Sequence, residues 1–87
     1  MTRNIIATKT FLAELKDIQK TRSSIYKHIN KLDTYLCAHG IDHKIRHVFD
    51  IEPLEDGYFR FKFVPYRIIV QVINDTTICF KKIFKRK

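Results

Sequence analysis

The segment GYFRFKFVPYRIIVQV, from Gly57 to Val72, contains the pattern that decides the fold. In its first half three phenylalanines alternate with Arg60 and Lys62, so a β-strand would place the aromatic rings on one face and the cations on the other. A second apolar run follows Val64-Pro65. The segment therefore predicts two strands joined by a tight turn, with one solid apolar face that other elements must cover.

The predicted turn sets which side chains face each other across the two strands. If Val64-Pro65 forms a two-residue turn, Lys62 faces Arg67 and Arg60 faces Ile69. Like charges directly opposite one another destabilise a pair of strands. The arrangement therefore favours a bound anion, typically a phosphate group, between the cations. A polar face whose cations simply point into water is the alternative.

The chain before this segment predicts one short strand and two helices. The strand is expected at Arg3–Ala7, and Thr8 or Thr10 can cap the helix that follows. Apolar side chains then recur at helical spacing in two stripes, which consist of Phe11, Leu15 and Ile18 and of Ile25, Ile29, Leu32 and Leu36. Gly40 is a typical residue to end the second helix. Two helices with a short connection predict an antiparallel hairpin.

The whole pattern predicts a single α+β domain over residues 1–87. Residues 45–51 are interpreted as a loosely apolar connection, EPLEDG (residues 52–57) and NDT (residues 74–76) as turns, and residues 77–84 as the last strand. The expected order is an N-terminal strand, a two-helix antiparallel hairpin and a three-stranded antiparallel meander. The helices should cover the phenylalanine face, and Phe80 and Phe84 should both lie in the core.

The charge of the protein indicates an anionic partner. The formal net charge is +8 over 87 residues, which is typical of proteins that bind nucleic acid or an acidic protein segment. The C-terminal end is the most basic part of the chain, so nucleic-acid contacts are expected there from Lys81, Lys82, Lys85 and Lys87. A solvated basic end is the alternative.

Several classes of site are disfavoured. Cys37 and Cys79 are too few and too far apart for a disulfide framework. Four residues that can bind a metal ion follow one another closely, at Cys37, His39, His43 and His47. Gly40 is expected to end the helix within this run, so these side chains would not share one face, and neither a metal site nor a cofactor is expected. The acidic residues from Asp50 to Asp56 are interpreted as a solvated loop. No apolar run has the length of a membrane span or a signal peptide, which predicts a cytoplasmic protein.

Two stretches resemble the RelE/ParE toxins of bacterial toxin–antitoxin pairs. PYRIIVQVINDTTICFKKIFKR (Pro65–Arg86) is similar to the last two strands of the family, with Tyr-Arg, an apolar run, a polar turn, a second apolar strand and a closing Lys-Arg. LEDGYFRFK (Leu54–Lys62) is similar to the family's segment in which Gly-Tyr leads into a basic strand. The expected order of elements agrees with the family over nearly the whole chain.

The RelE-like resemblance implies an endoribonuclease that cleaves messenger RNA on the ribosome without a metal ion. The ribose 2′-hydroxyl attacks the neighbouring phosphate, and the residues implied to assist are Arg67, Arg60, Lys62 and Arg86. The implied partners are the ribosome with its messenger RNA and a cognate antitoxin, whose flexible or helical segment wraps the domain. Operator DNA would be bound only through the antitoxin complex, and no membrane is involved.

One departure from the family leaves the function open. Many ribonuclease members carry a Tyr or His just beyond the last strand, and this sequence has neither before it ends at Lys87. The general base is therefore unassigned, with Tyr58, His47 or a lysine of lowered pKa as candidates. A ParE-like inhibitor of DNA gyrase and a non-catalytic basic binding module are the alternative functions.

Overall fold

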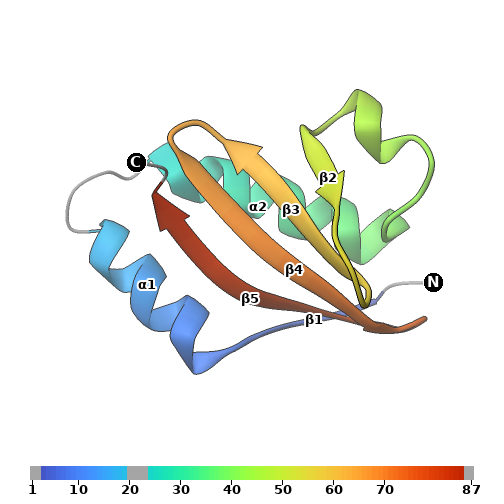
Figure 1. The fold of residues 1–87 in the computed structure, drawn as a ribbon, viewed down its shortest axis with the longest axis horizontal. Helices are drawn as coiled ribbons and strands as arrows, with labels where there is room; N and C mark the ends of the chain where they lie inside the picture. The colour runs from blue at the N-terminus through green and yellow to red at the C-terminus, as the bar shows by residue number, and fades with distance from the viewer. Residues whose placement is uncertain (1–2, 20–23, 86–87) are drawn as a thin grey trace.

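A five-stranded sheet is the framework of the residues that this computed structural model describes, 3–19 and 24–85 (Figure 1). The strand order is β1-β5-β4-β3-β2, in which β1 runs parallel to β5 and the other neighbouring pairs are antiparallel. The elements in chain order are β1 (Asn4–Ala7), α1 (Lys9–Gln19), α2 (Ser24–His39), the 3-10 turn η1 (Ile45–His47), β2 (Ile51–Pro53), β3 (Tyr58–Phe63), β4 (Tyr66–Asn74) and β5 (Thr77–Lys85). The predicted α+β class is confirmed, with a strand, two helices and then antiparallel strands.

Residues next to the start of α1 and the end of α2 explain where these helices begin and end. Thr8 is the cap of α1, because its hydroxyl oxygen accepts a hydrogen bond from the backbone N–H of Phe11 at 3.0 Å. The same hydroxyl donates to the carbonyl of Lys81 at 2.8 Å and so ties the helix to β5. After α2 the backbone turns at Gly40, which has φ +67° and donates its N–H to the carbonyl of Leu36. The break expected between the helices falls mostly on residues 20–23, which lie outside the described residues.

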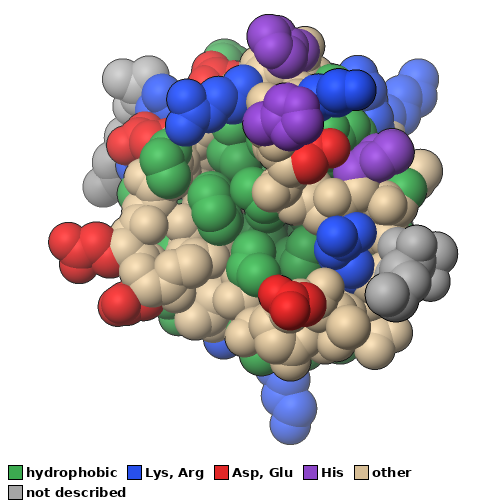
Figure 2. All heavy atoms as spheres, turned by 90° about the vertical axis from the view of Figure 1, so that its right-hand side faces the viewer, with side chains coloured by type: hydrophobic (Ala, Val, Ile, Leu, Met, Phe, Trp, Pro, Cys, Tyr) green, Lys and Arg blue, Asp and Glu red, His purple; other side chains and the backbone are tan. Residues whose placement is uncertain are grey.

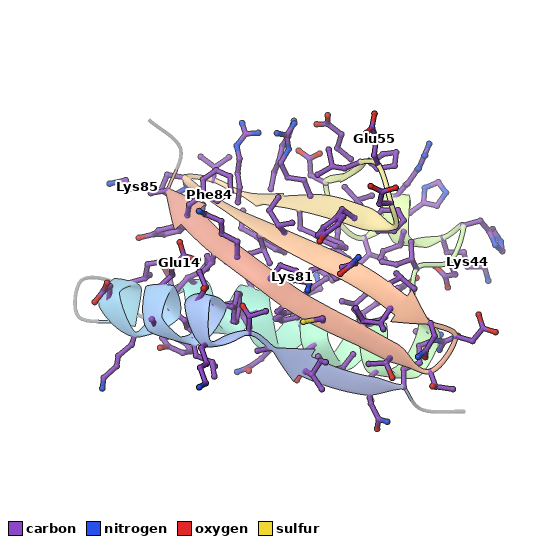
Figure 3. The ribbon with its side chains drawn as sticks, turned by 60° about the horizontal axis from the view of Figure 1, so that its bottom comes forward. Glu14, Lys44, Glu55, Lys81, Phe84 and Lys85 are labelled. Carbon is purple, nitrogen blue, oxygen red and sulfur yellow. The ribbon has the colours of Figure 1, made fainter. Side chains whose placement is uncertain are left out.

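Both helices lie on one face of the sheet, and the core fills the space between the two layers (Figure 3). The predicted stripe of α2 is buried at all four positions. From the sheet, Phe61 is fully buried while Phe59 and Phe63 pack against the core, so the predicted phenylalanine face is confirmed. Phe11 of α1 meets Phe80 of β5 edge-on, with 5.2 Å between the ring centroids. Within the described ranges no helix is long and apolar enough to cross a membrane.

The hairpin of β3 and β4 has the predicted register. Lys62 lies opposite Arg67, and Arg60 lies opposite Ile69. The turn consists of Val64 and Pro65, which are both exposed. Arg60, Lys62 and Arg67 therefore share the face of the sheet that points away from the helices, which we call the open face.

One strand was not predicted, and it adds a fourth member to the antiparallel meander. Residues 51–53 pair with β3, so part of the segment interpreted as a turn is strand β2. The pairing is extended by hydrogen bonds from the N–H of Lys62 to the carbonyl of Asp50 at 2.9 Å and from the N–H of Leu54 to the carbonyl of Tyr58 at 2.8 Å. A strand of three residues with a proline has no alternation that a sequence pattern could detect. The interpretation of Glu52 as part of a solvated loop was therefore wrong, whereas Asp50 is exposed and lies just before the strand.

Candidate anion-binding site

Arg67 lies at the centre of the open face, between Lys62 of β3 and Phe84 of β5. The register places both residues directly opposite it, one on each neighbouring strand. Neighbouring strands are about 4.8 Å apart. Arg67 is therefore flanked by Lys62 on one side and by Phe84 on the other.

The placement of Phe84 corrects the expectation that it belongs to the core. Phe80 is 4% exposed and packs in the core, whereas Phe84 is half-buried and aligns with Arg67 on the open face. The cause is a register shift between Ile69 and Val70, where Phe80 pairs with Val70 but Lys82 pairs with Ile69. The extra residue, Lys81, breaks the alternation and moves every later side chain of β5 to the opposite face.

Acidic residues border the three cations of the open face. The carboxylate of Glu52 accepts a hydrogen bond from the guanidinium of Arg60 and lies 4.0 Å from the Lys62 ammonium. The hydrogen bond from Arg60, followed by the charges of Arg60, Lys62 and Arg67, lowers the pKa of Glu52 below its ordinary value. The Nε of Arg60 is buried and has no hydrogen-bond partner within the described ranges. The hydrogen bond to Glu52 is therefore the one that holds this guanidinium in place.

A pocket of about 250 Å³ opens where the two facing cations reach the end of the hairpin. Its lining consists of Asp50, Lys62, Val64, Pro65, Tyr66 and Arg67. The pocket thus combines two cations with one exposed carboxylate at Asp50 and a wall formed by the turn. We call it the phosphate pocket, after the anion that the two facing cations led us to expect from the sequence.

The predicted lysines of β5 lie in different environments. Lys82 shares the open face with Arg67, and its ammonium lies 4.0 Å from Glu14 of α1. Lys81 is in the bulge and its carbonyl accepts the bond from Thr8. Lys85 is exposed near Phe84 at the end of β5, with Glu14 on the adjacent helix (Figure 3). Arg86 and Lys87 lie outside the described residues.

The two side chains considered as substitute bases are not in the phosphate pocket. Tyr58 lies on the open face opposite Gln71, four residues before Lys62 along β3 and therefore about 13 Å away. His47 is exposed in η1. Asp50 and Glu52, which sequence reasoning missed, lie closer to the cations. Their spacing of two residues would place both on one face of a strand, but nothing in the sequence pairs that strand with β3.

No group of three or more His, Cys, Asp or Glu side chains among the described residues is arranged to hold a metal ion. Cys37 and Cys79 are both free thiols. The site is therefore built from Lys, Arg, Asp, Glu and Phe side chains, which can bind an anion, exchange protons and stack on a planar group.

The backbone is similar to several solved structures, although no family model and no curated protein matches the chain. One chain of the Escherichia coli DinJ-YafQ toxin-antitoxin complex has a TM-score of 0.78 at 19% identity, covering 98% of this chain and 93% of that one. The archaeal RelE-RelB complex from Pyrococcus horikoshii OT3 gives 0.74 at 23% identity, covering 99% and 97%. The RelB-RelE antitoxin-toxin complex from Methanococcus jannaschii gives 0.70 at 22% identity, covering 92% and 88%.

The chain has the RelE toxin fold. The similarity extends over almost the entire chain, so the matched region is not limited to the elements that the sequence predicted. At these levels of identity the similarity concerns the arrangement of the backbone, and the chemistry depends on the side chains that this chain carries on the RelE fold.

Proposed function

We propose that this protein is the toxin of a toxin–antitoxin pair and that it cleaves messenger RNA on the ribosome. The observation that carries the proposal is the phosphate pocket, in which Lys62 and Arg67 face each other across two strands. Two facing cations destabilise the hairpin unless an anion lies between them. The RelE fold of the similar toxin structures supports the same assignment.

The cleavage that suits this pocket needs no metal ion. The 2′-oxygen of the ribose attacks the adjacent phosphorus while the bond from phosphorus to the 5′-oxygen breaks, leaving a 2′,3′-cyclic phosphate and a 5′-hydroxyl. Arg67 holds two phosphate oxygens through its guanidinium and stabilises the extra charge of the phosphorane. Lys62 lies opposite and donates a proton to the departing 5′-oxygen.

Asp50 is the group that we assign as proton acceptor for the 2′-hydroxyl. Its side chain lines the same pocket as both cations and is exposed, so it can approach a bound ribose. Glu52 is less suited, because its carboxylate already accepts the hydrogen bond of Arg60 and its pKa is lowered, which weakens it as a base. Glu52 instead positions Arg60 and reduces the repulsion among the cations before RNA binds.

Phe84 supplies a surface for a nucleotide base beside the phosphate. Its ring is half-buried on the open face, directly opposite Arg67. Aromatic side chains bind single-stranded RNA by stacking on unpaired bases. Arg86, Lys85 and Lys87 follow Phe84 in the sequence and would extend the phosphate contacts.

The proposal includes the partners and the place of action. A cognate antitoxin would bind the domain and cover the open face, and operator DNA would be contacted through that complex. The ribosome would present the messenger RNA to the phosphate pocket in the cytoplasm.

Controlled expression in bacteria tests the proposal, with mapping of the 5′ ends of cellular messages. The protein should arrest growth and produce new 5′ ends within translated codons. Arg67→Ala should abolish both effects, while Lys16→Ala, on the exposed surface of α1, should retain them. Arrest with intact messages would instead indicate a gyrase inhibitor. Absence of arrest with folded protein would leave the non-catalytic binding module.

A further inference from the structure

The outer edge of β5 changes partner half-way along the strand. β1 covers this edge only as far as Ala7, which lies opposite Phe80, whereas β5 continues to Lys85. Beyond Ala7 the chain leaves the sheet and enters α1, which packs against β5 through the contact of Phe11 with Phe80. The last part of β5 therefore has a helix, and not a strand, on its outer side (Figure 3). Backbone groups along such an edge need partners from side chains or from water.

Thr8 and Glu14 supply two of these partners. The Thr8 hydroxyl donates to the carbonyl of Lys81 at 2.8 Å. Oε1 of Glu14 accepts a hydrogen bond from the backbone N–H of Ile83 at 3.2 Å. The two bonds lie on either side of Lys82, directly after the register shift of β5. The cap and the second turn of α1 thus hold the backbone of β5 where its alternation has just been reversed.

Glu14 is placed on the side of α1 that faces the core. It follows Phe11 by three residues and precedes Ile18 by four, so it belongs to the apolar stripe of the helix. A carboxylate on such a stripe loses hydration and is favourable only where hydrogen-bond donors replace the water. The Glu14 side chain is 28% exposed, and the N–H of Ile83 is such a donor. The position therefore indicates a bond to β5 rather than a solvated acid.

The ion pair of Glu14 with Lys82 is a weaker reason for this placement. The ammonium and Oε2 are 4.0 Å apart, and the Lys82 side chain is 54% exposed. Ion pairs with this exposure contribute little to stability, because water screens them. The bond to the backbone of β5 is therefore the contact through which Glu14 acts.

The bond to Ile83 affects the open face through Phe84. Because Ile83 is fully buried, the next residue points to the opposite face, where Phe84 lies opposite Arg67. Arg67 lines the phosphate pocket. A displacement of the backbone at Ile83 would move Phe84 relative to Arg67, and with it the aromatic surface beside the pocket.

We propose that Glu14 is a positioning residue of the open face. By accepting the N–H of Ile83 it fixes the last part of β5, and so keeps Phe84 beside Arg67. Glu14 belongs to a helix on the other face of the sheet and does not contact the RNA. The inference rests on the proposed function for the ligand, which is single-stranded RNA, whereas the contact that holds β5 does not depend on it.

Message cleavage in a translation mixture tests this role with two substitutions of one residue. Glu14→Ala removes the acceptor, and the rate should fall about tenfold although the loss of a negative charge favours RNA binding. Glu14→Gln loses the same charge but keeps an oxygen that can accept the N–H of Ile83, and should cleave like the unmodified protein. A rate that Glu14→Ala leaves unchanged, or that Glu14→Gln does not restore, would overturn the inference.

Two other acidic residues are matched controls for charge. Asp17 is exposed on α1, and Asp75 is exposed in the turn between β4 and β5. That turn lies at the right-hand end of Figure 1, which Figure 2 shows face-on with acidic side chains at the surface. Asp17→Ala and Asp75→Ala change the net charge as Glu14→Ala does, and should leave the rate unchanged. Equal losses in all three variants would show an effect of charge alone and would contradict the role of Glu14.

A double variant tests the coupling of Glu14 to Phe84. Phe84→Ala should lower the rate by itself, because the aromatic surface is lost. If Glu14 acts through Phe84, adding Glu14→Ala to this variant should cause little further loss. Losses that multiply independently would overturn the inference.

Amide hydrogen exchange separates this inference from the proposed function. In Glu14→Ala the N–H of Ile83 loses its acceptor, so its exchange should become at least about tenfold faster, while that of the buried Val70 in β4 stays the same. Equal changes at both amides would mean a general loss of stability and would contradict the local role. If the unmodified protein cleaves no message, the proposed function fails, and the exchange of Ile83 still decides whether Glu14 holds β5.

Discussion

Lys62 and Arg67 lie directly opposite each other on neighbouring strands, and both line the phosphate pocket. Repulsion between the two cations disfavours the folded hairpin in the absence of a ligand. The phosphate proposed to bind between them would relieve this repulsion. The acidic side chain of Glu52, 4.0 Å from Lys62, reduces the repulsion in part.

Removing one of the two charges should stabilise the fold and abolish the activity. In Arg67→Thr, a strand-forming residue replaces the cation, and we expect the free energy of unfolding to rise by about 0.5 kcal/mol. Urea denaturation measures this change, and mapping of message ends measures the cleavage. Arg67→Lys keeps the charge and should show no gain in stability. A loss of stability in Arg67→Thr would mean that the guanidinium supports the fold rather than a ligand.

Asp50→Asn tests the proton acceptor. The amide cannot take the proton of the 2′-hydroxyl, so the rate of message cleavage in a translation mixture should fall about 100-fold or more at unchanged stability. Glu52→Gln keeps the carboxylate of Asp50 and should therefore cleave much faster than Asp50→Asn. If Glu52→Gln is the slower of the two variants, the two roles must be exchanged.

Glu52 should make the stability of the protein depend on pH. Its pKa is lower in the folded protein than in the unfolded chain, so it stabilises the fold above its ordinary pKa and loses this effect as the pH falls through the lowered value. Glu52→Gln should therefore reduce the loss of unfolding free energy between neutral and acidic pH. Glu55→Gln, in the exposed turn after β2, is the matched control and should behave as the unmodified protein. Identical pH curves for all three proteins would contradict the coupling of Glu52 to the cations.

The two threonines near the start of α1 should differ in their effect on stability. Thr8→Ala removes the helix cap and the bond to Lys81, and should lower the unfolding free energy by about 1–2 kcal/mol. Thr10→Ala changes an exposed position inside the helix and should have almost no effect. Thermal or urea denaturation of both variants gives the comparison. Equal losses would mean that Thr8 does not act as the cap.

Much of the fold could be predicted from the sequence, because the signals involved are local. The stripe of Ile25, Ile29, Leu32 and Leu36 requires only helical periodicity, and the phenylalanines of β3 require only alternation. A two-residue turn at Val64-Pro65 then sets the register of β3 and β4. For this reason the pairing of Lys62 with Arg67 followed from the sequence alone.

The open face could be only partly predicted, because it depends on pairings between distant segments. Phe84 would share a face with Phe80 in an unbroken strand, but the bulge at Lys81 reverses the alternation. That bulge is stabilised from α1 by the hydroxyl of Thr8, 73 positions away in the sequence. No periodicity within β5 reveals it.

The acidic residues of the site were also decided by the tertiary structure. Asp50 and Glu52 follow an irregular segment, and a three-residue strand has too little backbone to be stable by itself. They meet the cations because β2 pairs with the edge of β3, where Ile51 faces the buried Phe61. The sequence alone determined which cations face each other. Only the packing of the edge strand decided which carboxylates lie beside them, because side-chain contacts across a sheet depend on strand pairing and not on distance along the chain.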